Sequence, residues 1–587
     1  MHSLINTQNN NNKKRLQNIT SYLIGNSYQK NNQLYKPKKH EKQISYTTQN
    51  EVTMPVLKTL LVNKKFRMKL LYSMLKHFEF KIKMVINKMK NVNLSKYKKI
   101  KEQWAKTLHE VGGLAKDGTY NFGSDKVYEI LNQRYPDFFS TVKAQQDLTL
   151  LFQDMCDVCF GSENSKQCKP KQVLMFCNEL FKDIYDMKYK IEGNDIKLNL
   201  RSGTSFFELP PDTQEHIISI FANKTKTKTK SKTKTKSKTK TKTKSATNRR
   251  IFNTEKYQII LKHFLSNIKH LQDAIDNALQ LQGRARALNK IARIIAAFAQ
   301  SHIFAQDAYI NLVLTGPAGS GKTTLAEKIS AIFNYSGLVF RNTMKTASRV
   351  DFIGQYVGSS APLTASTLEN ARESVLFIDE AYDLVSCKSD APQNSGVCKQ
   401  FDSYSLEAVT QLVAFLSQNK GCIIVILAGY HAQVNDTILK ANEGLPRRFP
   451  IQLMLQPLPN DALFEIIQLT LKKQNIFMEL KKPSKEDSYN AKTIDNEASL
   501  AIVSLIEKDI PKPSNKRYPA IRSREIFKNE AASAITFAQL IAEFIFTRIK
   551  LDTLTICDMQ HIINEYVKLV SSNKLRYRSN PKCYESS

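Results

Sequence analysis

The chain has 587 residues, a formal net charge of +34 at pH 7 and nine cysteines. This length exceeds one ordinary hydrophobic core, so we expect more than one domain. The beginning, Met1 to Lys14, lacks the apolar segment of a secretory signal peptide, and no apolar run approaches the roughly 18 residues that span a bilayer. Irregularly spaced cysteines favour reduced thiols over a disulfide framework. We therefore expect a soluble intracellular protein, in the cytoplasm by preference, with the nucleus as the alternative.

The positive charge is concentrated in two stretches. Residues 1–100 hold 21 Lys and Arg against three acids, and the run 224–244 holds 11 Lys and no acid, so together they carry 29 of the 34 net charges. The run alternates Lys with Thr or Ser, a self-repelling composition that predicts an extended linker at 223–250. A solvated spacer is the favoured interpretation, and a tether for nucleic acid or another polyanion is the alternative.

The N-terminal half divides into a tail and a helical region. Residues 1–53 are dominated by Asn, Gln, Lys and Thr, which predicts a disordered tail. Residues 54–222 are expected to form a mostly helical domain of unknown function. Between Met54 and Lys90, apolar residues recur at helical spacing with Lys and Arg between them. Such basic amphipathic helices suit a membrane surface or an acidic partner, but packing against the following helices is favoured.

Four cysteines in this region are candidate zinc ligands: Cys156, Cys159, Cys168 and Cys177. A CxxC supplies two thiolate ligands from one turn. However, this CxxC lies in an expected helix, LLFQDMCDVCF, and the second pair of cysteines is not a CxxC. Buried thiols are therefore favoured over a zinc site.

After the linker, short aliphatic runs alternate with helical stretches. The runs are YINLVLTG, GLVFRNT, SVLFIDEA, GCIIVILAGY and FPIQLML, and strands of this kind are buried on both faces. We expect an α/β domain at 251–460, with a parallel sheet between two layers of helices. Beyond residue 460 the segments ALFEIIQLTLKK, EASLAIVSLIEK and EIFKNEAASAITFAQLIAEFIF predict a helical lid at 461–575, followed by a tail at 576–587.

A phosphate-binding loop follows the first aliphatic run. Residues 316–323 read GPAGSGKT, a complete GxxxxGK[ST], between the strand YINLVLT and the helix TTLAEKISAIF. In this context backbone N–H groups wrap the phosphates, Lys322 reaches the β and γ oxygens, and Thr323 holds Mg²⁺. The sequence predicts an ATP site made by Gly316, Pro317, Ala318, Gly319, Ser320, Gly321, Lys322, Thr323 and Thr324.

An acidic pair ends the run VLFIDE. Asp379 is expected to hold the magnesium ion through its water shell, and Glu380 to polarise the attacking water. Because this pair follows a phosphate-binding loop by about 55 residues, it favours hydrolysis over nucleotide binding alone.

The motifs from residue 352 onward resemble one family. FIGQYVGSSAPLTASTLENA, VLFIDEAYDL, FDSYSLEAVTQLVAFL, VILAGY and GLPRRFP are similar to the CbbX/CfxQ branch of the AAA+ ATPases, which includes rubisco-activase-like and sporulation-type members. The similarity covers roughly residues 280–535, and nothing before 250 belongs to it. The resemblance implies the P-loop AAA+ fold with a C-terminal helical lid, Mg-ATP hydrolysis and assembly into a ring.

The resemblance also implies roles for residues outside the phosphate-binding loop. Tyr356 matches the pore-loop aromatic that grips a substrate polypeptide in the centre of a hexamer. Arg448 matches the arginine finger that reaches the neighbouring subunit's γ-phosphate, with Arg447 as the runner-up.

In the lid, Arg524 resembles the second sensor, with Arg522 as its rival. Tyr430 stands where many family members place a polar first sensor. The insert 386–400, between the acidic pair and the next helix, departs from the family pattern.

The favoured function is ATP-driven remodelling of a protein partner by a homo-hexameric, chaperone-like ring without a membrane span. A finger supplied in trans is useless in a monomer, so hydrolysis should require assembly. The charge of the tail and linker motivates a second function, a nucleic-acid-associated motor or loader. A third is a nucleotide-gated scaffold that binds ATP and assembles but threads nothing.

Overall fold

The computed structural model describes residues 52–91, 136–165, 168–186, 188–192, 195–199, 203–223, 254–356, 358–386, 401–478, 492–507, 527, 529–547 and 553–570. Apart from one or two positions at their edges, the expected N-terminal tail, the linker and the insert 386–400 lie outside the described residues. The C-terminal tail and the two arginines Arg522 and Arg524 also lie outside them.

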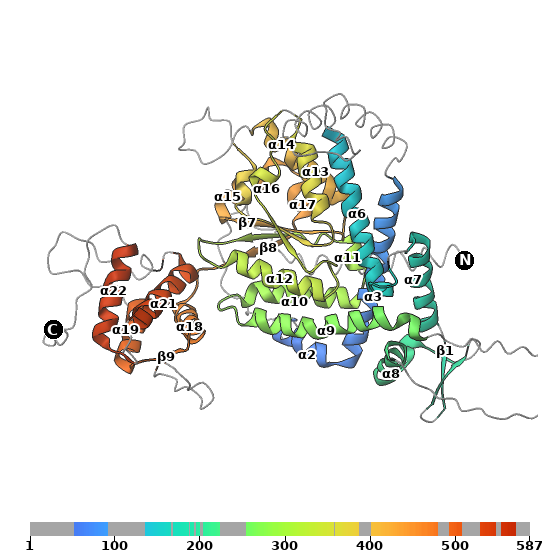
Figure 1. Cartoon of the computed structure of the whole chain (residues 1–587), viewed down its shortest axis with the longest axis horizontal. Coiled ribbons are helices and arrows are strands. Elements are labelled where there is room, and N and C mark those ends of the chain that lie inside the picture. The colour runs from blue at the N-terminus through green and yellow to red at the C-terminus, as the bar shows by residue number, and fades with distance from the viewer. Residues whose placement is uncertain are drawn as a thin grey trace, which may run out of the picture.

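A five-stranded parallel sheet forms the centre of the molecule (Figure 1). Its order is β5-β6-β7-β4-β8, and every neighbouring pair is parallel. Because β4 lies between β7 and β8, the loop that follows β4 leaves from the middle of the sheet's carboxyl edge. The strands are β4 (Leu312–Thr315), β5 (Met344–Ala347), β6 (Val375–Ile378), β7 (Ile424–Gly429) and β8 (Ile451–Met454).

Alternate residues of the strands face two hydrophobic cores. In β6, Val375 and Phe377 belong to one core, and Leu376 and Ile378 belong to the other. One face is covered by α13 and α14, and the opposite face by α12, α10 and α9 (Figure 1). The predicted three-layer α/β fold is thereby confirmed. The helices are α9 (Gln258–Leu279), α10 (Ala285–Gln300), α12 (Lys322–Tyr335), α13 (Ser360–Asn370) and α14 (Ser403–Gln418).

Four of the five predicted strands are present. The strand predicted at GLVFRNT begins later in the chain than predicted. The run GLVFRNT forms a loop, and the strand β5 begins at Met344, directly after it. Gly337 adopts φ +81, and the N–H groups of Phe340 and Arg341 donate to the carbonyl oxygen of Glu373, not to a strand partner. The apolar residues of this run are buried in the core, so their burial imitates a strand in the sequence.

The N-terminal helices pack directly on α9, α10 and α12. Helices α2 (Met54–Val62), α3 (Lys64–Asn91), α6 (Pro136–Phe160), α7 (Pro170–Ile184) and α8 (Pro211–Ala222) share one hydrophobic cluster with α9, α10 and α12. The apolar side chains of α2 and α3 are mostly buried in that cluster. This confirms the prediction that they pack against other helices rather than lie on a membrane surface. A small antiparallel sheet, β2-β1-β3, accompanies these helices, with β1 at Lys188–Glu192, β2 at Asp195–Asn199 and β3 at Thr204–Ser205.

The four candidate zinc cysteines are buried thiols of this cluster. Cys156, Cys159 and Cys177 are buried, and Cys168 is half-buried. Burial and the neighbouring Cys168 raise the pKa of the Cys156 thiol, and the neighbouring Cys177 together with burial raises the pKa of Cys159. No three His, Cys, Asp or Glu side chains gather as a metal site within the described ranges. The burial of Cys156, Cys159 and Cys177 agrees with the favoured interpretation of buried thiols. Elsewhere, Cys557 is disulfide-bonded, which departs from the expectation of reduced thiols.

The lid is a separate helical bundle with its own core. It contains α18 (Asn460–Lys472), α19 (Asn496–Glu507), α21 (Glu530–Thr547) and α22 (Ile556–Val570). Short parallel strands β9 (Ile476–Met478), β10 (Lys492–Ile494) and β11 (Thr553–Leu554) pair in the order β11-β10-β9. By length and composition alone, α21 passes as a membrane-spanning helix, which the sequence analysis overlooked, and it is the one such helix in the described part. Its side chains Ala534, Phe537, Ala538 and Ile541 form part of the lid core.

Candidate active site

The phosphate-binding loop connects the end of β4 to the start of α12. Gly319 and Gly321 adopt φ +69 and +76, a region that glycine enters without steric cost. The N–H of Gly316 donates to the carbonyl oxygen of Gly429 at 3.2 Å, which fixes the loop to the end of β7. A Cβ added to Gly321 would meet no atom within 4 Å. The loop therefore leaves open space beside its last glycine.

Lys322 begins α12 and folds back over the loop. Its Nζ donates to the carbonyl oxygens of Gly316 at 3.2 Å and Pro317 at 3.0 Å. The same nitrogen lies 5.2 Å from the centre of the Tyr430 ring, at the end of β7. Thr323 and Thr324 are exposed on the first turn of the helix. Thus the ammonium group and a hydroxyl stand at the open side of the loop, where phosphate oxygens need a cation and Mg²⁺ needs a ligand.

The acidic pair lies at the carboxyl end of β6. Asp379 is exposed, and one of its carboxylate oxygens accepts a hydrogen bond from the N–H of Glu380 at 3.0 Å. Glu380 has φ +45, a left-handed conformation that costs a non-glycine residue about 1 kcal/mol or more. Its Oε2 is buried without a hydrogen-bond partner in the structure. An unpartnered carboxylate oxygen held in a strained turn suits a group that accepts a hydrogen bond from water.

Tyr382 and Tyr430 flank this carboxylate. Their ring centres lie 6.0 Å apart. Burial and the nearby Glu380 carboxylate raise the pKa of the Tyr382 hydroxyl. A Cβ on Gly429, the last residue of β7, would lie 2.9 Å from the Tyr382 ring. The aromatic side chains therefore close the space between β6 and β7 beside Glu380.

A magnesium nucleotide fits these residues. The open space at Gly321, the unpartnered Glu380 oxygen and the exposed Thr323 and Asp379 stand at one edge of the parallel sheet. Thr323 and Asp379 are oxygen ligands of the kind that Mg²⁺ prefers, with phosphate oxygens and water completing its shell. Held by Thr323 and Asp379, the ion would supply positive charge that offsets the charge developing on the phosphates.

Three residues of the site were missed in the sequence. His431 lies directly after Tyr430, and its Nδ1 is 3.1 Å from the hydroxyl of Thr315, at the end of β4. Arg284 and Glu530 approach the loop from α10 and from the lid. No short motif marks Arg284 or Glu530, because the loop and these residues come together only through the packing of the lid.

Arg448 and Tyr356 lie apart from the phosphate-binding loop. The Arg448 guanidinium donates to Ser417 Oγ at 2.8 Å and to the Gly444 carbonyl oxygen at 3.1 Å, whereas Arg447 is exposed. Tyr356 is 71% exposed, and its backbone is held in a turn by Ser359. Nearby in sequence, Val350 is 77% exposed. The hydrogen bonds described for Arg448 and Tyr356 thus go to residues outside the phosphate-binding loop.

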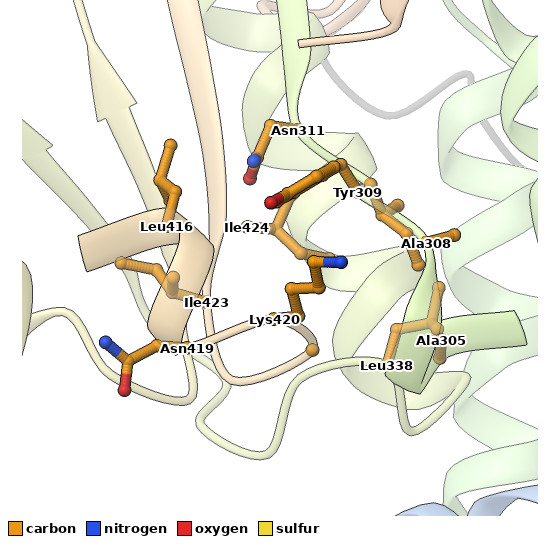
Figure 2. Close-up of a pocket in the computed structure, with 12 residues that line it drawn as sticks. Ala305, Ala308, Tyr309, Asn311, Leu338, Leu416, Asn419, Lys420, Ile423 and Ile424 are labelled. Atoms are coloured by element: carbon orange, nitrogen blue, oxygen red, sulfur yellow. The ribbon is translucent and has the colours of Figure 1, made fainter. Parts of the chain in front are cut away.

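The pocket in Figure 2 lies at the opposite end of the sheet. Its lining includes Tyr309 and Asn311, which precede β4, and Lys420 and Ile424 near the start of β7. The Nζ of Lys420 lies 4.7 Å from the centre of the Tyr309 ring. Since the phosphate-binding loop follows the carboxyl end of β4, this pocket is no part of the nucleotide site.

Residues 312–456, which run from β4 to just beyond β8, match the family described as ATPase family associated with various cellular activities (AAA). The ESX-1 secretion system protein EccA1 of Mycobacterium tuberculosis is 35% identical over 183 residues, which are 31% of this chain and 30% of that protein. The ESX-3 secretion system protein EccA3 of Mycobacterium leprae is 29% identical over 209 residues, which are 34% of this chain and 30% of that protein.

Among solved structures, the Thermotoga maritima RuvB Holliday junction branch migration motor is 14% identical with a TM-score of 0.30, and the match covers 49% of this chain and 71% of that one. The chain spans about 30% of the length of these curated relatives. Residues 312–456 are therefore similar to the AAA ATPase family, and they carry both the phosphate-binding loop and the acidic pair.

Proposed function

We propose that the whole chain binds Mg-ATP at the loop 316–324 and couples its hydrolysis to the remodelling of a protein partner in a ring. The observation that carries the proposal is the unpartnered Oε2 of Glu380 at the same sheet edge as the open phosphate-binding loop. In this proposal Lys322 binds the β and γ phosphates, while Thr323 and Asp379 hold the magnesium ion. Glu380 accepts a hydrogen bond from the water that attacks the γ-phosphate.

Ring assembly and a protein partner are supported by the side chains that lie outside the nucleotide site. Arg448 and exposed Arg447 are candidates for the neighbouring subunit's γ-phosphate, and exposed Tyr356 is a candidate for contact with a polypeptide. The resemblance to the CbbX/CfxQ branch supports a homo-hexamer, with Arg524 as the second sensor of the lid. The relatives named as secretion system proteins favour a protein as the partner. We propose an intracellular location for this assembly.

A polyanion contact through the lysine run is the second candidate function. It is supported by the 11 Lys without an acid between 224 and 244. Charge of this kind gives affinity without sequence preference, so it adds to the ATPase function and does not replace it.

The nucleotide site is tested by Lys322→Ala, with Lys328→Ala on the same helix as the matched control. Lys322→Ala removes the cation expected on the β and γ phosphates, so ATP affinity measured by calorimetry should fall at least about a hundredfold. Lys328→Ala should bind ATP as the parent chain does. Equal ATP affinity of Lys322→Ala and the parent would overturn the assignment of the loop.

A further inference from the structure

Arg284 joins three segments around the phosphate-binding loop. It directly precedes α10 and is 5% exposed. One guanidinium nitrogen donates to the carbonyl oxygen of Ser320 in the loop at 2.7 Å, and the other to that of Gln456, between β8 and the lid, at 2.8 Å. The Arg284 nitrogen that donates to Ser320 also lies 3.7 Å from a carboxylate oxygen of Glu530 in the lid. One buried side chain thus connects the loop, the segment that leads to the lid, and the lid itself.

Glu530 brings a negative charge to this place. It is the first residue of α21, is 7% exposed and has φ +44. Its Oε2, the oxygen nearest Arg284, is buried without a hydrogen-bond partner in the structure. Burial raises the pKa of this carboxyl, and the charges of Arg284 and Lys322 lower it in part. The carboxylate therefore lies in the field of the lysine that is expected to bind the phosphates.

The start of α21 lies against the loop. A Cβ on Gly319 would collide with the carbonyl oxygen of Asn529, the residue before Glu530. At the other side of Arg284, a Cβ on Gly283 would lie 2.9 Å from the Leu458 side chain, which is near the start of the lid. The close approaches at Gly319 and Gly283 and the Arg284–Glu530 ion pair therefore set the distance between the lid and the loop.

We propose that Arg284 is a positioning residue for nucleotide binding, and that Glu530 is its counter-ion. The phosphates of a nucleoside triphosphate carry the same sign of charge as Glu530, so the two compete for the cations at the loop. Binding of the triphosphate displaces the Glu530 carboxylate and moves the first turn of α21 away from the loop. Arg284 meanwhile keeps Ser320 and Gln456 in place. This inference rests on the proposed nucleotide site and deepens it.

The charge competition is tested with Glu530→Gln, and Glu543→Gln on the exposed side of the same helix is the matched control. Calorimetry on the full chain compares AMP, ADP and ATP in the presence of Mg²⁺. Removing one like charge beside the phosphates should raise ATP affinity by about tenfold. The gain should be smaller for ADP and close to none for AMP, whereas Glu543→Gln should change none of the three. A gain that is the same for all three nucleotides, or a loss for ATP, would overturn the competition.

The positioning role is tested with Arg284→Met and Arg284→Lys, with Arg286→Met at an exposed position two residues away as the control. Loss of the two hydrogen bonds that hold the loop should weaken ATP binding by about tenfold in Arg284→Met. Lysine restores the charge but cannot span both carbonyl oxygens, so Arg284→Lys should recover less than half of that loss on a logarithmic scale.

Full recovery by lysine would show that charge alone acts, and would overturn the positioning role of the guanidinium. The unfolding temperature of each variant, measured without nucleotide, separates loss of the lid fold from loss of binding. If Glu530→Gln lowers it strongly, Glu530→Asp keeps the charge while withdrawing it from the loop and should give a smaller gain in ATP affinity. A parent chain that binds no ATP would reject the nucleotide site itself. If the parent binds ATP, and Glu530→Gln has the same relative affinities for AMP, ADP and ATP as the parent, only this inference is rejected.

Discussion

Lys81 of α3 donates a hydrogen bond to Glu373 at 2.5 Å, and the two side chains are 2% and 0% exposed. The same ammonium group donates to the carbonyl oxygen of Leu338 at 2.7 Å. Glu373 lies two residues before β6, whose carboxyl end bears the acidic pair. An N-terminal helix outside the matched family segment thus contacts the base of the strand that positions Glu380.

Breaking this pair should destabilise the protein. Lys81→Met leaves a buried carboxylate without its partner, which costs about 3 to 5 kcal/mol. The double variant Lys81→Met with Glu373→Gln should recover part of that loss, because no buried charge remains unpaired. Lys83→Met is the control: Lys83 is half-exposed, and its buried partner Glu79 keeps Lys76, so the loss should be less than about 1 kcal/mol. The unfolding temperatures of the full-length variants give their order of stability. A Lys81→Met protein as stable as Lys83→Met would show that the buried pair contributes nothing.

Glu380→Gln should separate nucleotide binding from hydrolysis. The amide keeps the shape of the side chain but accepts a proton far less readily, so phosphate release should fall by about a hundredfold or more. ATP affinity should stay within about threefold of the parent, because the phosphate-binding loop is unchanged. Asp383→Asn, one turn further along, is the control with parental turnover expected. Turnover of Glu380→Gln at the parental rate would remove Glu380 from the chemistry.

A mixture of Arg448→Ala and Glu380→Gln proteins should recover hydrolysis that neither protein has alone. Some interfaces in the mixture then pair an intact Glu380 with an intact Arg448 from the neighbouring subunit. Within its own subunit, Arg448 is held by the neutral oxygens of Ser417 and Gly444, and a phosphate is a stronger partner for a guanidinium. Arg447→Ala gives the comparison. Recovery only with Arg447→Ala would move the finger to that residue, and no recovery with either would reject a finger in trans.

Tyr356→Ala should abolish stimulation of ATP hydrolysis by the partner protein while leaving basal hydrolysis unchanged. The side chain is 71% exposed, so its loss should not disturb the core. Tyr404→Ala, at the start of α14, gives the comparison with a second tyrosine. The readout is phosphate release with and without candidate protein partners. Parental stimulation of Tyr356→Ala would favour the scaffold or the nucleic-acid function over threading.

Deletion of residues 224–244 should weaken retention on DNA or RNA and spare basal hydrolysis. Eleven lysines are removed, so the dependence of retention on salt should become shallower. A chain of the same length with Gly and Ser in place of this run separates the charge from the spacing. The same retention and salt dependence in all three chains would reduce the run to a spacer.

The amino-acid sequence was enough to predict the nucleotide site and the fold around it. GPAGSGKT and VLFIDE are local patterns whose roles depend on a strand, a turn and a helix that the same residues form. Aliphatic runs with alternating faces also identified β4, β6, β7 and β8, because strands buried on both sides need apolar residues at every position. The run GLVFRNT shows the limit of this signal, since a buried loop requires the same composition.

Which residues meet across long stretches of sequence follows from the packing of the elements. Lys81 meets Glu373 across 292 positions of sequence, and Arg284 meets Glu530 because the lid folds back onto the loop. A lone charged residue on a helix reads as solvated in the sequence, since a charge is buried only where a partner from another element arrives. The pairing that sets its role is a property of the packed helices, and no spacing along the chain encodes it.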